Sequence, residues 1–428
     1  MDNMFLLSLL KKEMLTAMGC TEPAAAALCG AKTHELMGNK ELSCLKISAS
    51  RDMVKNAMGV GIPSSPSKGL SAAVSLGYSV GCTDNGLSIL SSVTDAQVAQ
   101  AGRIRTELQI VQNVPPLYVC VTAEATDGTS CVAAISGEHD RFCRLERFGE
   151  LLLSVPMDPS ESCCDTDDVL KNLTFDEVIA FAESVDIGTL SFVRDAIRTN
   201  YDIAVFSMEG NFGLEVGKTM MEGIGKDVRS LKDAFSKGAA LAAAGSDARM
   251  SGCPMPVVIN SGSGNQGITV TVPVKVVADF LGCDEDRTVR AVCISELVGL
   301  ILTARKNRLS ALCGVFTAAI GTACAWVYLL GGDSGMMSMA LNTMVGNLSG
   351  IICDGAKNTC ALKIYSSLEC ASMSVRLALK GLSPGSESGI VGGKISETIN
   401  NLSRLCNEGM RETDNTVMSI MISKSKKQ

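Results

Sequence analysis

The chain has 428 residues, enough for two or three domains that each bury a hydrophobic core. Its formal net charge is −7 and the charges form no long runs, which excludes a basic footprint for nucleic acid or for an anionic membrane surface. Hydrophobic residues make up 46% of the chain but aromatic residues only 4%. Glycine, alanine, cysteine and methionine take their place, which favours helices with closely approaching backbones.

The N-terminal segment predicts a cytosolic protein. Its lysine pair, Lys11 and Lys12, follows the apolar run, which reverses the order found in a secretory signal peptide. The eighteen cysteines are therefore expected to be reduced, and most of them to be small buried residues. The chain has only two histidines, so cysteine or carboxylate side chains must carry any metal site, and a Ser-His-Asp triad is hard to build.

The hydrophobic pattern predicts two helices at the start of the chain and strands after them. Helical spacing runs from Phe5 to Met14, and Pro23 suits the first turn of a second helix toward Met37. Period-two patterns then predict strands at LKISAS, TELQIVQ, PLYVCVTAEA and TSCVAAIS, with a helix at DAQVAQAGRI. Asp127-Gly128 joins the last two strands in a hairpin. The polar connection DPSESCCDTDD ends this α/β unit.

Helical patterns return near residue 175. The clearest are FDEVIAFAES, TLSFVRDAIRTN, DVRSLKDAFSKGAALAAAG and EDRTVRAVCISELVGLILTARK. The sequence therefore predicts an α+β protein. A mostly helical domain comprises residues 1–44 and 176–428, and an α/β domain with its connecting segment, residues 45–175, is inserted into it.

An uncharged stretch, residues 309–332, is long enough to span a bilayer. Glycine, alanine, threonine, cysteine and serine fill most of it, so its hydrophobicity per residue is low for contact with lipid. Small residues also occur at interfaces between membrane helices, which leaves both interpretations open. The composition favours the core of a soluble protein.

Two short motifs have the composition of binding or catalytic sites. In GCTEP, Cys20 precedes a helix start, where the helix dipole lowers the pKa of a thiol; the alternative is a loop with a buried thiol. SGSGNQG, residues 261–267, offers backbone N–H groups and polar side chains to a carboxylate or phosphate, without a dinucleotide or Walker pattern. Because ITVTVPV follows, the motif is alternatively the turn before a strand.

Four cysteines in the C-terminal half have the composition of a metal site, although their spacing is a weak signal. Cys313 and Cys324 lie in the uncharged stretch, and Cys353 and Cys360 flank DGAKNT. Seven residues of straight helix rise about 10.5 Å, which is long for two thiolates at one metal centre. If Cys353 lies in a loop and a helix begins after Gly355, the two sulfurs can converge beside Cys313.

Five motifs follow one another along nearly the whole chain: GCTEP, SDARMSGCPMP, SGSGNQGI, LSALCG and ICDGAKNTCALK. Together, and in this order, they resemble the motifs of the iron–sulfur L-cysteine desulfidases, a family related to the catalytic domain of bacterial iron–sulfur L-serine dehydratases. The resemblance implies a cytosolic enzyme with a mostly helical catalytic domain, an inserted α/β domain and an oxygen-labile [4Fe–4S] cluster. It also makes the uncharged stretch a buried helix.

Carried over residue by residue, Cys313, Cys353 and Cys360 match the cluster ligands, and Cys20 matches the N-terminal cysteine beside the site. Three protein ligands leave one iron open as a Lewis acid. The pair around DGAKNT is closer together than its equivalent in serine dehydratases, so Cys324 is kept as an alternative ligand.

The resemblance implies β-elimination of L-cysteine to hydrogen sulfide, ammonia and pyruvate. Cys20 as a thiolate is the first candidate for the base, followed by Lys357 and Glu22, for which a helix-end salt bridge is the alternative. The residues expected to hold the substrate carboxylate are Ser261, Ser263, Asn265 and Gln266.

Three other functions remain open from the sequence: L-serine dehydration at the same iron, a non-catalytic iron–sulfur sensor, and a pyridoxal-phosphate lyase. The expected partner is a small amino acid, with no nucleic acid and no membrane. A homo-oligomer is possible.

Overall fold

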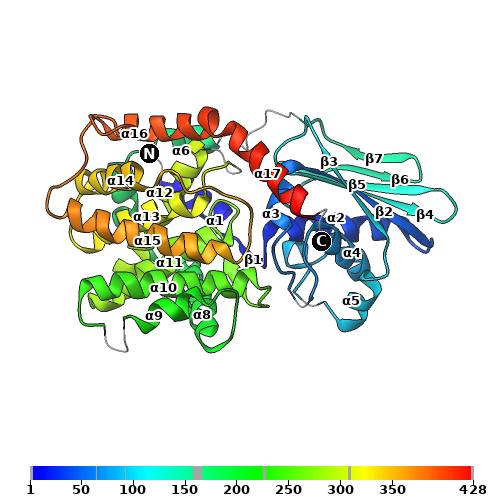
Figure 1. Ribbon diagram of the computed structural model, residues 1–428, viewed down its shortest axis with the longest axis horizontal. Coiled ribbons are helices and arrows are strands. Elements are labelled where there is room, and N and C mark those ends of the chain that lie inside the picture. Colours follow the sequence, from blue (N-terminus) through cyan, green and yellow to red (C-terminus); the bar gives the residue numbers. More distant parts are fainter. Residues whose placement is uncertain are drawn as a thin grey trace.

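Two large hydrophobic cores organise the chain, one among helices and one beneath a β-sheet. Figure 1 shows the helical unit and the unit with the sheet side by side. The computed structural model describes residues 3–63, 65–91, 93–157, 166–224, 228–306 and 310–425. This arrangement confirms the predicted α+β class, with a mostly helical unit and a smaller unit that contains the sheet. The predicted boundary segment DPSESCCDTDD falls largely outside the described residues.

The helical unit surrounds the larger core. Its helices are α1 (Asn3–Glu13), α6 (Thr166–Asn172), α7 (Phe175–Ser184), α8 (Ser191–Glu209), α9 (Val216–Glu222), α10 (Leu231–Met250), α11 (Gly264–Phe280), α12 (Glu285–Lys306), α13 (Gly314–Leu329), α14 (Ser334–Leu348), α15 (Thr359–Ala378) and α16 (Ile395–Arg404), with short turns η2 (Ile187–Leu190) and η3 (Leu405–Gly409). A two-stranded antiparallel ribbon, β1 (Thr16–Met18) with β8 (Pro256–Val258), ties the N-terminal segment to this unit.

The smaller unit contains a six-stranded mixed sheet in the order β3-β2-β4-β5-β6-β7. Its elements are β2 (Leu42–Ser50), β3 (Thr106–Val111), β4 (Tyr118–Ala125), β5 (Ser130–Ser136), β6 (Phe142–Arg147), β7 (Glu150–Ser154), α2 (Thr21–Met37), α3 (Arg51–Ala57), α4 (Leu70–Val80), α5 (Asp95–Ala101) and the turn η1 (Gly86–Ser88). Only β2 and β3 are parallel, and Val121 of β4 pairs with Ile47 and Ala133 on its two sides. The predicted hairpin at Asp127-Gly128 joins β4 to β5.

The chain crosses between the units at different points from those predicted. A boundary after residue 44 would place α2 with the helical unit, but α2 packs on α4, β4 and β5, and its alanines lie in the smaller core. Its buried face is made of small residues, so it can lie very close to α4. The chain therefore changes unit near Cys20. It returns at its end, where α17 (Arg411–Ser425) crosses from the helical unit and buries Met418 in the smaller core (Figure 1).

The uncharged stretch forms α13 in the middle of the helical unit. It packs against α11, α12, α14 and α15, and its indole, Trp326, donates a 3.1 Å hydrogen bond to the carbonyl of Pro273. Gly321 lets the backbone of α12 approach, since a Cβ there would lie 2.3 Å from the carbonyl oxygen of Ser295. In the part of the chain that the structure describes, no helix is long and apolar enough to cross a membrane.

The structure excludes the alternative in which a strand follows SGSGNQG. The segment ITVTVPV lies inside α11, with Pro273 in the helix interior. Its β-branched residues are buried on every side of this helix, so tertiary packing outweighs their strand propensity. The sequence patterns also missed α3, α4, β6 and β7.

Contact between α2 and α4 predicts a strong effect of one methyl group. A Cβ on Gly77 would lie 1.9 Å from the carbonyl oxygen of Ala27, so Gly77→Ala must separate the two helices. We expect it to lower the free energy of unfolding by about 1–3 kcal/mol, measured by urea denaturation followed by circular dichroism. Gly102→Ala is the control, because φ is −63° there and its Cβ would make only ordinary contacts. Equal stability of the two variants would contradict the packing.

Candidate active site

A cavity of about 560 Å³ lies between the two units. Nearly all of the residues predicted to form the site line it: Cys20, Glu22, Ser261, Ser263, Asn265, Gln266, Cys313, Cys353 and Cys360. Lys357 is not among the lining residues. Its ammonium group binds the carbonyl and, at 3.4 Å, the carboxylate of Asp354, which is the salt bridge named as its alternative role. Cys324 also lies away from the cavity, buried in α13.

Main-chain pairing brings the two cysteine segments together. Leu312 and Ile352 form an antiparallel bridge, the N–H of Cys313 donates to the carbonyl of Ile351 at 2.9 Å, and the N–H of Cys353 donates to Ala311 at 2.6 Å. Cys313 is the N-cap residue of α13, so its side chain leaves the helix at the cavity wall. Residues forty positions apart are thereby held in one fixed arrangement.

A glycine lets Cys353 and Cys360 face the same cavity. Gly355 has φ +90°, and a Cβ there would lie 2.0 Å from the carbonyl oxygen of Lys55 in α3. The chain therefore turns sharply against the α/β unit after Cys353, and α15 begins at Thr359, one residue before Cys360. This loop followed by a helix is the geometry that the sequence predicted for convergence of the two sulfurs.

The three thiols influence one another electrostatically. The thiol of Cys313 donates to Cys353, which lowers the pKa of Cys353 to about 6 against the effect of burial, and the Lys55 ammonium acts in the same direction. The same hydrogen bond, together with burial, raises the pKa of Cys313. Burial raises the pKa of Cys360, and the charge of Lys363 partly offsets it. The cysteine wall is thus flanked by cations that favour bound anionic sulfur.

Cys20, the N-cap residue of α2, and Glu22 in the first turn of α2 form a thiol–carboxylate pair. Cys20 precedes α2 as predicted, but burial and the charge of Glu22 raise its pKa, so the predicted lowering by the helix dipole is outweighed. Its thiol donates to Glu22 at 2.9 Å, and the Asn56 amide donates to the other carboxylate oxygen at 2.9 Å. Burial acts to raise the pKa of Glu22, but the charge of His139 and these hydrogen bonds hold it below its ordinary value. The pair at neutral pH is a carboxylate and a protonated thiol.

The SGSGNQG segment forms a tight turn and the start of α11. Asn260 and Ser263 pair through their backbones, and Ser261 and Gly262 between them have φ of +51° and +78°. Thr21 donates a 2.9 Å hydrogen bond to the carbonyl of Gly262, which links the turn to α2. The N-terminus of α11, with the positive end of its dipole, is therefore directed at the cavity, and the Ser263 hydroxyl caps it by accepting the N–H of Gln266 at 3.4 Å.

Two amides of this segment differ in their partners. The Oε1 atom of Gln266 accepts a hydrogen bond from Thr303 at 3.2 Å. Asn265 is buried; its amide nitrogen contacts only the sulfur of Met250 at 3.6 Å, and its Oδ1 atom has no hydrogen-bond partner among the described residues. An unsatisfied buried amide on a cavity wall indicates a ligand position.

Sequence reasoning missed several polar residues of the cavity, among them Lys55, Asn56, His139 and Arg249. Arg249 is 2% exposed and donates to the carbonyl of Gly19 at 3.0 Å. Its place in the motif SDARMSGCPMP was the available signal. The other three come from the α/β unit, and no local pattern marks them.

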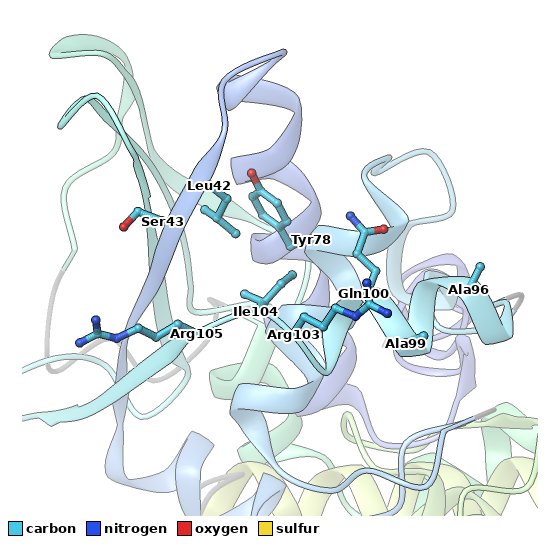
Figure 2. Close-up of a pocket in the computed structure, with 9 residues that line it drawn as sticks. All are labelled: Leu42, Ser43, Tyr78, Ala96, Ala99, Gln100, Arg103, Ile104 and Arg105. Carbon is cyan, nitrogen blue, oxygen red and sulfur yellow. The ribbon is translucent and has the colours of Figure 1, made fainter.

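A second hollow, of about 400 Å³, lies in the α/β unit between α4, α5 and the start of β2 (Figure 2). Its lining has two arginines, of which Arg105 pairs with Glu107 at 2.7 Å and points away from the others in Figure 2. No cysteine and no carboxylate lines it. The larger cavity is therefore the candidate active site.

Comparison with known proteins adds family information. The family model of the serine dehydratase alpha chain matches residues 84–419. A UPF0597 protein of Oleidesulfovibrio alaskensis is 38% identical over 424 residues, which cover 98% of this chain and 97% of that protein. UPF0597 proteins of Aeromonas hydrophila and Parabacteroides distasonis are each 35% identical, over 98% of this chain and over 96% and 98% of their own lengths.

The turn at Gly355 generates a prediction that needs no bound cofactor. Gly355→Ala must displace the loop, because its Cβ would meet the Lys55 carbonyl in a backbone conformation unfavourable for alanine. We expect faster hydrogen exchange at the N–H of Cys353, which loses its bond to Ala311, measured by mass spectrometry. Gly350→Ala is the control in the same region, since nothing lies within 4 Å of its Cβ. Unchanged exchange in Gly355→Ala would contradict the assigned loop geometry.

Proposed function

The chain belongs to the serine dehydratase alpha chain family, and we propose from this premise that it is a lyase that eliminates the β-substituent of an L-amino acid. The proposed substrate is L-cysteine, and the products are hydrogen sulfide, ammonia and pyruvate. One observation carries the proposal: three cysteines from two segments share a cavity with the polar turn at the start of α11 and with a thiol–carboxylate pair.

The donor set fits a [4Fe–4S] cluster held by Cys313, Cys353 and Cys360. Among the described residues, no group of three or more histidine, cysteine or acidic side chains is arranged to hold one metal ion. A cluster does not require that arrangement, because each thiolate binds a different iron. When bound, the cluster supplies a Lewis-acidic iron for the sulfur of the substrate. The nearby cations of Lys55 and Lys363 suit a group of anionic sulfurs.

The turn and the start of α11 are proposed to bind the substrate carboxylate. The N-terminus of a helix favours an anion, and Asn265 has its amide buried at this position without a strong partner. The guanidinium of Arg249 lies beside Gly264, where a Cβ would be 2.4 Å from its Nε atom. Ser263 adds a hydroxyl group on the same wall, and Ser261 helps to shape this wall, because its own hydroxyl donates to the side-chain oxygen of Asn260. Holding the carboxylate here fixes the Cα and Cβ atoms relative to the cysteines.

Glu22 replaces Cys20 as the first candidate for the base. The carboxylate is ionised, whereas the Cys20 thiol keeps its proton and donates it in a hydrogen bond to Glu22. In the proposed step the α-proton of the substrate moves to Glu22, the Cα–H electrons form the Cα–Cβ double bond, and the Cβ–S electrons leave with sulfur. The resulting aminoacrylate hydrolyses to pyruvate and ammonia. Cys20 orients the carboxylate as a positioning residue.

L-Serine is the second candidate substrate, because the matching family model carries the name of serine dehydratase. The cysteine-lined wall favours a soft sulfur leaving group over a hydroxyl. Anaerobically reconstituted protein separates the two by sulfide released from L-cysteine and pyruvate released from L-serine. We expect the higher kcat/KM with L-cysteine. A higher kcat/KM with L-serine would change the substrate, and no turnover of either would favour a sensor.

We also place the protein in the cytosol, where free thiols and an oxygen-labile cluster persist.

Alanine substitutions test the ligand assignment. Cys313→Ala, Cys353→Ala and Cys360→Ala should each lose bound iron and activity, because a cluster held by two thiolates dissociates readily. Cys324→Ala is the matched control, a buried cysteine of α13 that does not line the cavity, and it should keep both. Cys20→Ala should keep iron, because Cys20 is not a proposed ligand, and should lower kcat, because the Glu22 carboxylate loses the thiol hydrogen bond that orients it. Iron analysis and the visible spectrum are the measurements, and iron retained in any of the first three variants contradicts its role.

Asn265→Ala tests the carboxylate site. Loss of a hydrogen bond to a charged group costs about 1.5–3 kcal/mol, so KM should rise about 10- to 100-fold while the iron content stays unchanged. Asn342→Ala is the control, because Asn342 of α14 also has a buried, unpartnered amide oxygen but lies outside the cavity. Steady-state kinetics with L-cysteine give the answer. A KM equal to that of the control variant would remove Asn265 from the binding site.

A further inference from the structure

A buried carboxyl group that the proposed function does not use lies directly behind the Asn260–Ser263 turn. Glu296 of α12 is fully buried, and its Oε2 atom accepts a 2.6 Å hydrogen bond from the side-chain amide of Asn260. The same amide nitrogen also reaches the backbone carbonyl of Glu296 at 3.2 Å. The Asn260 oxygen in turn accepts the hydroxyl of Ser261 at 3.0 Å. A continuous chain of hydrogen bonds thus runs from α12 to the cavity wall.

The turn needs such support because its backbone is unfavourable. Ser261 has φ +51°, in the left-handed region that a residue with a Cβ adopts at a cost. Two backbone hydrogen bonds close the turn, from Asn260 to Ser263 and back, at 3.1 and 2.9 Å. Asn260 itself is 0% exposed, so its amide is not in contact with bulk solvent and depends on partners inside the protein. Removing the carboxyl would leave one of the two amide N–H donors without its partner inside the core, while the other could still reach the backbone carbonyl of Glu296.

The protonation state of Glu296 makes glutamine its close mimic. Burial raises the pKa of Glu296 to about 8, against the opposing hydrogen bond from Asn260, and Glu13 of α1 raises it further. Cys293 on the same helix is the other titratable group coupled to it. At neutral pH the side chain is therefore a neutral carboxyl with one oxygen that accepts from Asn260. A glutamine amide has the same shape and charge and offers the same acceptor.

We propose that Glu296 is a positioning residue which, through Asn260, holds Ser261 and the start of α11 in the conformation that binds the substrate carboxylate. This inference rests on the proposed function, because the turn is taken to be the carboxylate site. Glu296 does not line the cavity, so it acts only through the turn.

The first test measures the turn directly and does not depend on catalysis. Glu296→Ala should speed hydrogen exchange of the peptide that contains residues 260–263, whereas Glu296→Gln should leave it as in the wild type. Ser295→Ala is the matched control, because Ser295 is the neighbouring buried residue of α12 and its hydroxyl has no partner among the described residues. Unchanged exchange in Glu296→Ala overturns the inference, whatever the activity. If Glu296→Ala does not fold, Glu296→Leu fills the volume without an acceptor and is compared in the same way.

The second test measures binding through kinetics. Glu296→Ala should raise KM about tenfold with kcat within about threefold, and Glu296→Gln should restore KM, since one hydrogen bond in the turn is at stake. The double variant Glu296→Ala with Asn260→Ala should be no worse than either single variant, because both remove the same chain of contacts. Additive effects, or an unchanged KM in Glu296→Ala, overturn the inference. If wild-type protein turns over no β-substituted amino acid, the proposed function fails. Hydrogen exchange of residues 260–263 then still decides whether Glu296 supports the turn.

Discussion

Main-chain pairing between residues 311–313 and residues 351–353 is the contact on which the candidate active site depends. It joins the loop before α13 to the loop before α15, and it sets the position of Cys313 and Cys353 without any contribution from their side chains. Cys360 follows from the same contact, because α15 starts only a few residues later. Backbone hydrogen bonds between two loops that lead directly into helices hold a site more precisely than side-chain contacts alone. The thiols are therefore placed by the fold and remain available for chemistry.

Small residues explain how this site can lie at the junction of two units. Gly355 contacts the backbone of α3, and Gly262 approaches the ring of His139. Each of these contacts would be blocked or strained by a side chain. Glycines also allow close backbone contacts inside each unit, where Gly77 lies against α2 and Gly321 lies against α12. Closely packed interiors leave little room for local adjustment. The shape of the cavity therefore depends on how the two units pack against each other.

Local sequence signals predicted those parts of the site that depend on local structure. The glycine after Cys353, the helix start after Cys20 and the polar turn before α11 are short-range features, and their residues meet in one cavity. Lys55 and His139 were not predicted, because their roles depend on how the α/β unit packs against the helical unit. The thiol pKa of Cys20 was predicted in the wrong direction, since the helix dipole is a weaker influence than full burial beside a carboxylate. The strand suggested by ITVTVPV failed for the same reason: the pattern is local, whereas burial on every side of α11 is tertiary.

The three groups of the cavity have distinct electrostatic characters, and this separation bears on the proposed reaction. Lys55 and Lys363 make the cysteine wall favourable for anionic sulfur, the N-terminus of α11 favours a carboxylate, and Glu22 supplies the negative charge that can accept a proton. An elimination needs these three properties at the leaving group, at the anchored end of the substrate and at Cα. If the base lay beside the anchored end of the substrate, it would repel the substrate carboxylate. If the cations lay beside Cα, they would make the base a weaker proton acceptor. In the proposed reaction, three fixed points of contact around one tetrahedral carbon would also distinguish an L-amino acid from its mirror image, so the arrangement that separates the charges would also select the configuration of the substrate.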